Sequence, residues 1–208
     1  MMPTVHILVL AAGASSRMVG QDKLLMSIGK APLLRAVVTV AAATGAPVFV
    51  TLPPVANARL AVIADLPVQV VPVPDASKGL SRSIAQGVGA VFAGNPGPED
   101  GLMILPGDMP GFVEAALSDL ISRFRAEPAA IFRGGTASGQ PGHPVIFPRD
   151  LWLDLATLTG DEGGRSVLRQ NQSRVRVIPL PGPMAILDLD TPADWAAWAQ
   201  PESTASSP

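Results

Sequence analysis

A loop of small residues that ends in two cations is the first feature of the sequence able to do chemistry. The run Ala11-Ala12-Gly13-Ala14-Ser15-Ser16 is followed by Arg17 and, six residues later, by Lys23. Small residues let the backbone approach a ligand, and successive exposed N–H groups can bind phosphate oxygens. Arg17 offers a forked donor and Lys23 a point charge. The loop matches neither G-x-x-x-x-G-K-S/T nor G-x-G-x-x-G. It therefore favours phosphate binding, with an ordinary loop carrying two solvated cations as the alternative.

Three aspartates have the chemistry of a site for a hard cation. Asp108 stands just past the apolar run 102–105, between glycine and a Met-Pro pair. Mg²⁺ binds carboxylates together with substrate phosphates, although such an Asp can also simply turn the chain before a helix. Asp188 and Asp190 are two apart, so on a strand they share a face. Two carboxylates on one face repel each other unless a cation joins them, and capping the next helix is the alternative role.

Two further polar groups lie at predicted helix starts. Gly79, Ser81 and Ser83 open a segment of helical spacing, where free N–H groups suit a base carbonyl or a phosphate. The alternative is an ordinary serine cap. Thr191 and Asp194 have the spacing of an N-cap and an N3 acid, so we expect Asp194 to be structural.

Short apolar runs alternate with helical segments along most of the chain. Strands are predicted at residues 5–10, 48–52, 68–73, 102–105 and 129–132, and helices at 33–44, 56–64, 80–92 and 112–124. Continuous apolar runs are typical of strands that are buried on both faces. The alternation predicts an α/β fold, a three-layer α/β/α sandwich around a mostly parallel sheet. In such sheets ligands bind beyond the carboxyl ends of the strands, where the polar residues stand.

The pattern changes after residue 133. A Gly-rich polar segment covers residues 134–142, and short pieces follow at 145–147, 151–158, 175–178 and 186–189. We interpret residues 134–180 as an insertion or lid built onto the sheet of a single domain, 1–199. The Ser-, Thr- and Pro-rich residues 200–208 are expected to form a disordered tail.

Composition narrows the class of protein. The 15 Lys and Arg against 17 Asp and Glu, with only 4% aromatic residues, argue against a nucleic-acid partner. Cysteine is absent, which excludes disulfides, thiolate zinc sites and a cysteine nucleophile. Gly45, Pro47, Pro53 and Pro54 interrupt the long uncharged stretch 36–58, so no membrane span is predicted. We expect a cytoplasmic protein.

The loop from Leu10 to Met18, followed by Asp22-Lys23-Leu24-Leu25, resembles the signature of the MobA-like nucleotidyltransferases. Within that family it is most similar to the molybdenum cofactor cytidylyltransferase branch, and Val19 stands where guanylyl-transferring relatives have glycine. The resemblance implies a Rossmann-like fold of the nucleotide-diphospho-sugar-transferase type. It also implies transfer of a nucleoside monophosphate from an NTP to a phosphorylated acceptor, with release of pyrophosphate.

The same resemblance assigns roles to the other motifs. The residues implied in nucleotide binding are Leu10, Ala11, Ala12, Gly13, Ser15, Arg17, Lys23, Gly79, Ser81 and Ser83. Asp108 matches the Mg²⁺-binding aspartate, with Asp188 and Asp190 beside the metal and Mn²⁺ as a possible substitute. His143, Asp161 and Arg165 match motifs on the acceptor side.

These assignments predict a Mg²⁺-dependent transfer of CMP from CTP to the phosphate of molybdopterin. The acceptor is already an anion, so Arg17, Lys23 and Asp108 would act by positioning and neutralising charge. Ala12 replaces a glycine of the guanylyltransferases and therefore favours cytosine. The alternatives are a GTP-using guanylyltransferase, a sugar-phosphate nucleotidyltransferase, and a non-catalytic escort that carries nucleotide or cofactor. A molybdoenzyme or its chaperone would be a further partner.

Overall fold

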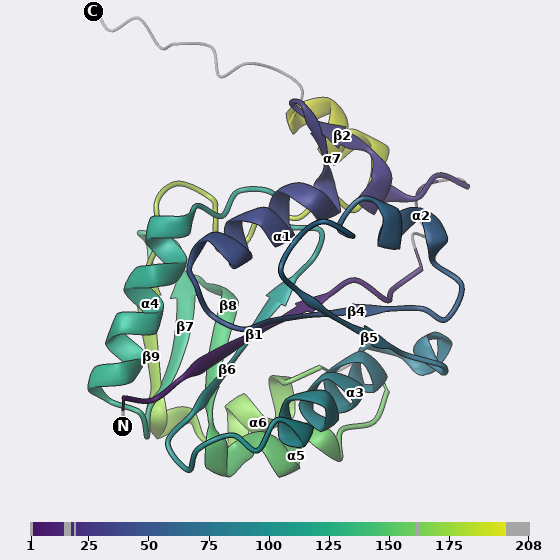
Figure 1. Cartoon of the computed structure of the whole chain (residues 1–208). Helices are drawn as coiled ribbons and strands as arrows, with labels where there is room; N and C mark the ends of the chain where they lie inside the picture. The colour runs from purple at the N-terminus through teal and green to yellow at the C-terminus, as the bar shows by residue number, and fades with distance from the viewer. Residues whose placement is uncertain (1, 15–17, 19, 161–162, 199–208) are drawn as a thin grey trace, which may run out of the picture.

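The computed structural model describes residues 2–14, 18, 20–160 and 163–198. A seven-stranded sheet forms its centre, with the strands in the order β5-β4-β1-β6-β8-β7-β9 (Figure 1). The strands are β1 (Val5–Leu10), β4 (Val48–Leu52), β5 (Gln69–Pro72), β6 (Gly101–Pro106), β7 (Ile131–Gly135), β8 (Pro141–Pro148) and β9 (Val175–Pro179). Among the described strands of this sheet, β8 runs antiparallel to both neighbours and the other pairings are parallel.

Helices cover both faces of the sheet, which confirms the predicted three-layer sandwich (Figure 1). Helices α1 (Leu33–Ala43) and α4 (Glu114–Ala126) lie on one face, and α3 (Leu80–Ala93), α5 (Trp152–Ala156) and α6 (Arg165–Gln170) lie on the other. Shorter elements are η1 (Lys23–Leu25), the hairpin β2 (Ser27–Ile28) and β3 (Ala31–Pro32), α2 (Asn57–Ala61), η2 (Ala76–Lys78), η3 (Arg149–Leu151), η4 (Gln172–Arg174) and α7 (Pro192–Trp198). In the described part of the chain, no helix is both long and apolar enough to cross a membrane.

The continuous apolar strands are explained by a core on each side of the sheet. Successive side chains of a strand point to opposite faces. Ile7 and Val9 of β1 accordingly pack in the core beneath α1 and α4, whereas Leu8 packs in the core beneath α3. In β6, Met103 joins the first core and Ile104 the second. Both faces of these strands need apolar residues, so the pattern is a run rather than an alternation.

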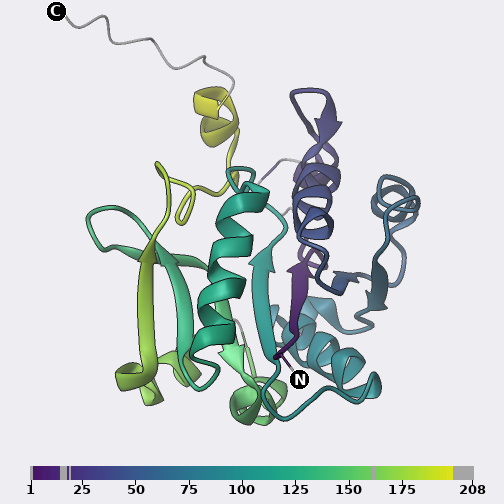
Figure 2. The ribbon, with the colours of Figure 1, turned by 60° about the vertical axis from the view of Figure 1, so that its left-hand side comes forward.

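The structure corrects the interpretation of residues 134–180 as an insertion or lid on the sheet. Strand β8 lies inside the sheet, between β6 and β7, and β9 pairs with β7 at the edge (Figure 2). Strands β7 and β8 form an antiparallel hairpin whose turn is closed by Thr136, where the Thr136 N–H donates to the Gln140 carbonyl at 2.9 Å. The predicted piece 145–147 is the apolar part of β8, and prolines and glycines in the rest of the strand hide its full length from a search for hydrophobic runs.

The short apolar piece at 186–189 does not become a strand: residue 186 ends a turn and residues 187–189 have no regular secondary structure. The segment is tied to the end of β6 by a hydrogen bond from the Leu189 N–H to the Asp108 carbonyl at 3.1 Å. The cap that follows it is as predicted. The Asp194 carboxylate accepts hydrogen bonds from the Thr191 hydroxyl at 2.8 Å, the Thr191 N–H and the Asp190 N–H. The hydrogen bond from the Thr191 hydroxyl is the main cause that lowers the pKa of Asp194.

Candidate active site

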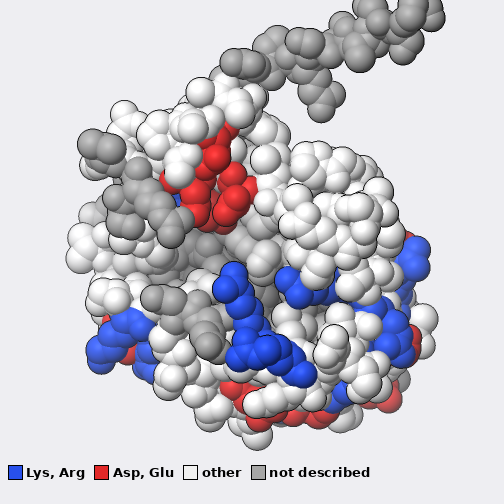
Figure 3. Space-filling view, turned by 180° about the vertical axis from the view of Figure 1, so that it is seen from behind, with Lys and Arg blue, Asp and Glu red and all other residues white. Residues whose placement is uncertain are grey.

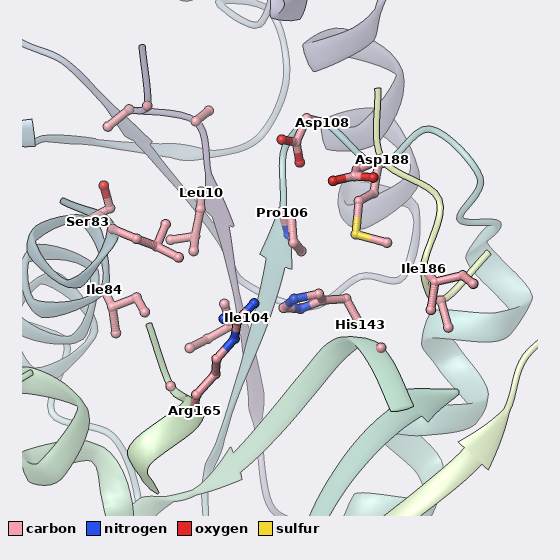
Figure 4. A pocket seen from close by; sticks show the side chains of 18 of the residues that line it. Leu10, Ser83, Ile84, Ile104, Pro106, Asp108, His143, Arg165, Ile186 and Asp188 are labelled. Atoms are coloured by element: carbon pink, nitrogen blue, oxygen red, sulfur yellow. The ribbon is translucent and has the colours of Figure 1, made fainter. Parts of the chain in front are cut away.

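The carboxyl ends of β1, β6 and β7 open into a cavity of about 470 Å³ (Figure 4). The loops after β1 and β6 form its walls together with Arg133 of β7, the start of β8, the beginnings of α3 and α6 and the segment that leads to Asp188. The cavity brings together ten of the residues singled out in the sequence: Leu10, Ala11, Ala12, Gly13, Lys23, Ser83, Asp108, His143, Arg165 and Asp188. These come from segments that are far apart in the chain.

Not every sequence-predicted residue is among those that line the cavity. Ser15, Arg17 and Asp161 fall outside the described residues. Gly79 and Ser81 lie outside the cavity wall that the described residues form. The Ser81 side chain is fully buried at the start of α3, and its N–H donates to the Gly160 carbonyl at 3.2 Å. Gly79 precedes the helix with a φ of 110°, a conformation that glycine adopts readily.

Lys23 joins two of the predicted metal-binding carboxylates. Its Nζ donates to Asp108 Oδ2 at 2.6 Å and also to Asp190 Oδ1. The Lys23 side chain is 14% exposed. Burial opposes its charge, but attraction and hydrogen bonds from Asp108 and Asp190 outweigh that cost and raise the pKa of Lys23. Asp190 therefore takes part in the site through Lys23.

A third carboxylate adds negative charge at the same end of the cavity. Burial, followed by the charges of Asp190 and Asp108, raises the pKa of Asp188. Asp188 therefore lies near enough to Asp108 and Asp190 for their negative charges to oppose its ionisation. Among the described residues, no three or more His, Asp or Glu side chains form a ready metal cage. Carboxylates that form no cage of their own can still hold a divalent cation when a substrate phosphate supplies the other oxygens.

Basic side chains face this acidic end from the opposite side of the cavity. Arg133 follows the apolar part of β7, and its Nε donates to the Gly142 carbonyl at 2.8 Å. Burial lowers the pKa of Arg133, and the charge of nearby Arg165 lowers it further. Figure 3 shows the hollowed face with acidic atoms gathered on one side and basic atoms on the other. An anion with two negative charges would relieve the repulsion between the two guanidinium groups.

Sequence reasoning missed Arg133, although a signal for it was present. It is the first residue after the predicted strand 129–132. The rule that pointed to Asp108, that ligands bind beyond the carboxyl ends of parallel strands, applies equally to this position.

His143 lies between the two charged ends of the cavity and is neutral at physiological pH. Burial is the main cause that lowers its pKa to about 4, and Arg133 lowers it further against an opposing effect of Asp108. The backbone N–H of His143 donates to the Ala185 carbonyl at 2.7 Å, so the backbone of β8 holds the segment that leads to Asp188. A neutral imidazole can offer one donor and one acceptor to a substrate.

The low pKa of His143 predicts a dependence of stability on pH. Between about pH 6.5 and about pH 4 the unfolded chain binds a proton at His143 and the folded protein does not. The free energy of unfolding therefore falls as the pH is lowered through this range, by up to about 3 kcal/mol from this residue. His143→Gln should lose that part of the pH dependence. Urea unfolding of both proteins at about pH 7 and about pH 5 measures it. Parallel losses in the two proteins would contradict the expectation.

Comparison with models of protein families agrees with the resemblance seen in the sequence. Residues 7–175 match the model of the MobA-like NTP transferase domain. Among curated protein sequences, none matches the chain significantly.

Several solved structures are similar over nearly the whole chain. Rv0371c from Mycobacterium tuberculosis H37Rv is 29% identical with a TM-score of 0.79, and the match covers 95% of this chain and 98% of that one. A complex of Rv0371c with manganese is also similar, at 28% identity with a TM-score of 0.74 over 94% of this chain and 97% of that one. The homologue of Rv0371c from Mycobacterium sp. strain JC1 is 32% identical with a TM-score of 0.78, and 93% of each chain is covered.

A more distant structure shares the fold. It is the 4-diphosphocytidyl-2C-methyl-D-erythritol synthase from Anaerococcus prevotii DSM 20548, which is 13% identical with a TM-score of 0.72 over 94% of each chain. The sandwich and its sheet are therefore of the nucleotide-diphospho-sugar-transferase type.

Proposed function

The chain belongs to the family of MobA-like NTP transferase domains and is therefore a nucleotidyltransferase, and from this premise we propose that it transfers CMP from CTP to the phosphate of a molybdopterin-type acceptor. One observation carries the proposal. A single cavity has Lys23, Asp108 and Asp188 at one end, where Lys23 also binds Asp190, and has Arg133 and Arg165 at the other. Two phosphorylated substrates can approach each other between two such ends.

The nucleotide is assigned to the end formed by the loop after β1. Ala11, Ala12 and Gly13 would bring their backbone close to the triphosphate, and Lys23 would neutralise part of its charge. Arg17 adds a second cation in the family signature. Because the attacking group is an anion, lowering the negative charge around the α-phosphorus is the main task of these residues.

The carboxylates fit a divalent cation. Asp108, together with Asp188 or Asp190, offers hard oxygen donors that lack a complete cage of their own. A bound Mg²⁺ or Mn²⁺ would neutralise triphosphate charge there. The complex of Rv0371c with manganese supports a divalent cation in the related protein.

The acceptor is assigned to the basic end. Arg133 and Arg165 would clamp its phosphate, and neutral His143 would orient it by a hydrogen bond. One oxygen of this phosphate attacks the α-phosphorus of the nucleotide. The new P–O bond forms as the bond to the leaving pyrophosphate breaks, so the reaction needs no protein nucleophile and no net proton transfer.

Release of pyrophosphate tests the proposal. The purified protein is incubated with each of the four NTPs and Mg²⁺, with and without molybdopterin. We expect release that requires CTP and molybdopterin together. Release with GTP would indicate a guanylyltransferase, and release only with a sugar phosphate would change the acceptor class. Tight binding of nucleotide without any release would indicate a non-catalytic escort and would contradict the proposal.

Ala12 provides a test of base selection. Ala12 is 4% exposed and lines the cavity, so its methyl group would narrow the space at the end assigned to the nucleotide. Ala12→Gly should raise the ratio of kcat/KM for GTP to that for CTP about tenfold, because one methyl group contributes ~1–3 kcal/mol of discrimination. Steady-state rates with both nucleotides measure the ratio. An unchanged ratio would show that other residues choose the base.

A further inference from the structure

Arg59 of α2 is a buried cation that lies beside the loop after β1. Its side chain is only 8% exposed. The Nε donates to Asp22 Oδ2 at 2.6 Å and Nη2 to Asp22 Oδ1 at 2.9 Å. The Nη1 donates to two backbone carbonyls, that of Ala11 at 2.7 Å and that of Gly13 at 3.0 Å. One guanidinium therefore contacts both the beginning and the end of the loop.

The contacts at the beginning of the loop affect its polarity. Ala11 and Gly13 line the cavity, and both of their carbonyl oxygens bind Arg59. A carbonyl oxygen that faced a polyphosphate would repel it, since both carry negative charge. By holding these two oxygens, Arg59 keeps the first residues of the loop in a conformation that suits an anion.

The contact at the end of the loop affects Lys23. Asp22 Oδ1 also accepts a hydrogen bond from the Leu24 N–H at 3.1 Å and caps the turn η1, in which Lys23 is the first residue. Arg59 therefore fixes Asp22, and the cap fixes the backbone from which Lys23 reaches Asp108. The sequence signature contains Asp22, and these contacts give that residue a structural role.

We propose that Arg59 is a positioning residue that fastens the two ends of the nucleotide-binding loop, with Asp22 as its partner. The inference rests on the proposed function, because it assumes that this loop binds the triphosphate. Only arginine can do this task, since a planar fork reaches one carboxylate and two carbonyls at once. A lysine keeps the positive charge but cannot make all four contacts.

The test compares Arg59→Lys and Arg59→Ala with a matched control. Arg35 makes the same kind of contacts elsewhere: Nη1 and Nη2 bind Asp65 at 2.6 and 2.8 Å, and Nη1 binds the Val62 carbonyl at 2.9 Å. Arg35→Ala therefore removes a similar fork away from the cavity. For each variant, kcat and both KM values are measured by release of pyrophosphate, the Kd for CTP by calorimetry, and the Tm by circular dichroism.

We expect Arg59→Lys to raise the KM and Kd for CTP at least about tenfold, with the acceptor KM changed less than about twofold. Arg35→Ala should leave the KM for both substrates and the Kd for CTP unchanged. Guanidinium ion at a concentration well below that which unfolds the protein should partly restore Arg59→Ala, and Arg59→Lys decides the matter if the alanine variant does not fold.

Two results would overturn the inference. One is an unchanged affinity for CTP in Arg59→Lys, even if its Tm falls. The other is an equal rise in the KM for CTP and in the KM for the acceptor, which would indicate general destabilisation of the protein. Failure of the proposed function is distinct from both, because the unaltered protein would then release no pyrophosphate and bind no CTP.

Discussion

Replacing Lys23 by alanine is expected to lower kcat by about 100- to 1000-fold while the protein remains folded. The Lys23 ammonium lies 2.6 Å from Asp108 and also contacts Asp190, at the end of the cavity assigned to the triphosphate. Without it, the carboxylates repel one another and the phosphates, and the barrier to anionic attack rises. Release of pyrophosphate at saturating CTP and molybdopterin measures the effect.

Lys30→Ala is the matched control for this variant. Lys30 is exposed in the turn between β2 and β3, so its loss removes the same charge from the surface. Lys30→Ala should keep the normal rate, and circular dichroism should show both variants folded. Because the carboxylates remain, Lys23→Ala should still bind Mn²⁺. A normal turnover rate in Lys23→Ala would remove this residue from the mechanism.

Replacing Asp108 by asparagine is expected to lower kcat at least about 100-fold and to weaken the binding of divalent cations. Asp108 follows β6, and its backbone is held on both sides, by the pairing of β6 with β1 and by the bond from the Leu189 N–H. Asparagine has nearly the same shape, so the fold should persist while the negative charge is lost. Calorimetric titration with Mn²⁺ and the Mg²⁺ dependence of turnover measure the two effects.

Asp119→Asn controls for the loss of a carboxylate elsewhere. Asp119 lies on α4, half-exposed and paired with Arg123 at 2.7 Å. This variant should bind Mn²⁺ and turn over as the unaltered protein does. Lys23→Ala and Asp108→Asn should both lose turnover, but only Asp108→Asn should lose the divalent cation. The two variants therefore separate the role of Lys23 from that of the metal ligand. Unchanged Mn²⁺ affinity in Asp108→Asn would move the metal away from Asp108.

The central strands were predictable because both of their faces are buried. The expected strands 5–10 and 48–52 agree with β1 and β4 at every boundary. In each, side chains on both faces must be apolar, so the run ends where burial ends. The same logic located the loop after β1 and the turn that carries Asp108, and the cavity brings these two segments together.

The parts that could not be predicted depend on contacts between distant segments. Arg59 lies in a five-residue helix after a proline pair, and its partners are two carbonyls and an aspartate 37 positions earlier. Backbone carbonyls leave no mark in a sequence, so nothing there points to Arg59. Strand β8 was predicted only in part, as the piece 145–147, because prolines and glycines mask the apolar pattern of its first half. Its place between β6 and β7 depends on pairing with segments distant in the chain.

The contact between Lys23 and Asp190 has a consequence for how the protein folds during synthesis. The two residues are separated by 167 positions. On the ribosome, the loop and β1 emerge early, but their carboxylate partner cannot join them until residue 190 has been synthesised. Contacts of such high sequence separation form late, because the entropy of closing a long segment must be overcome first. Competence to handle a nucleotide should therefore arise only after residue 190 has been synthesised rather than grow as the sheet is built.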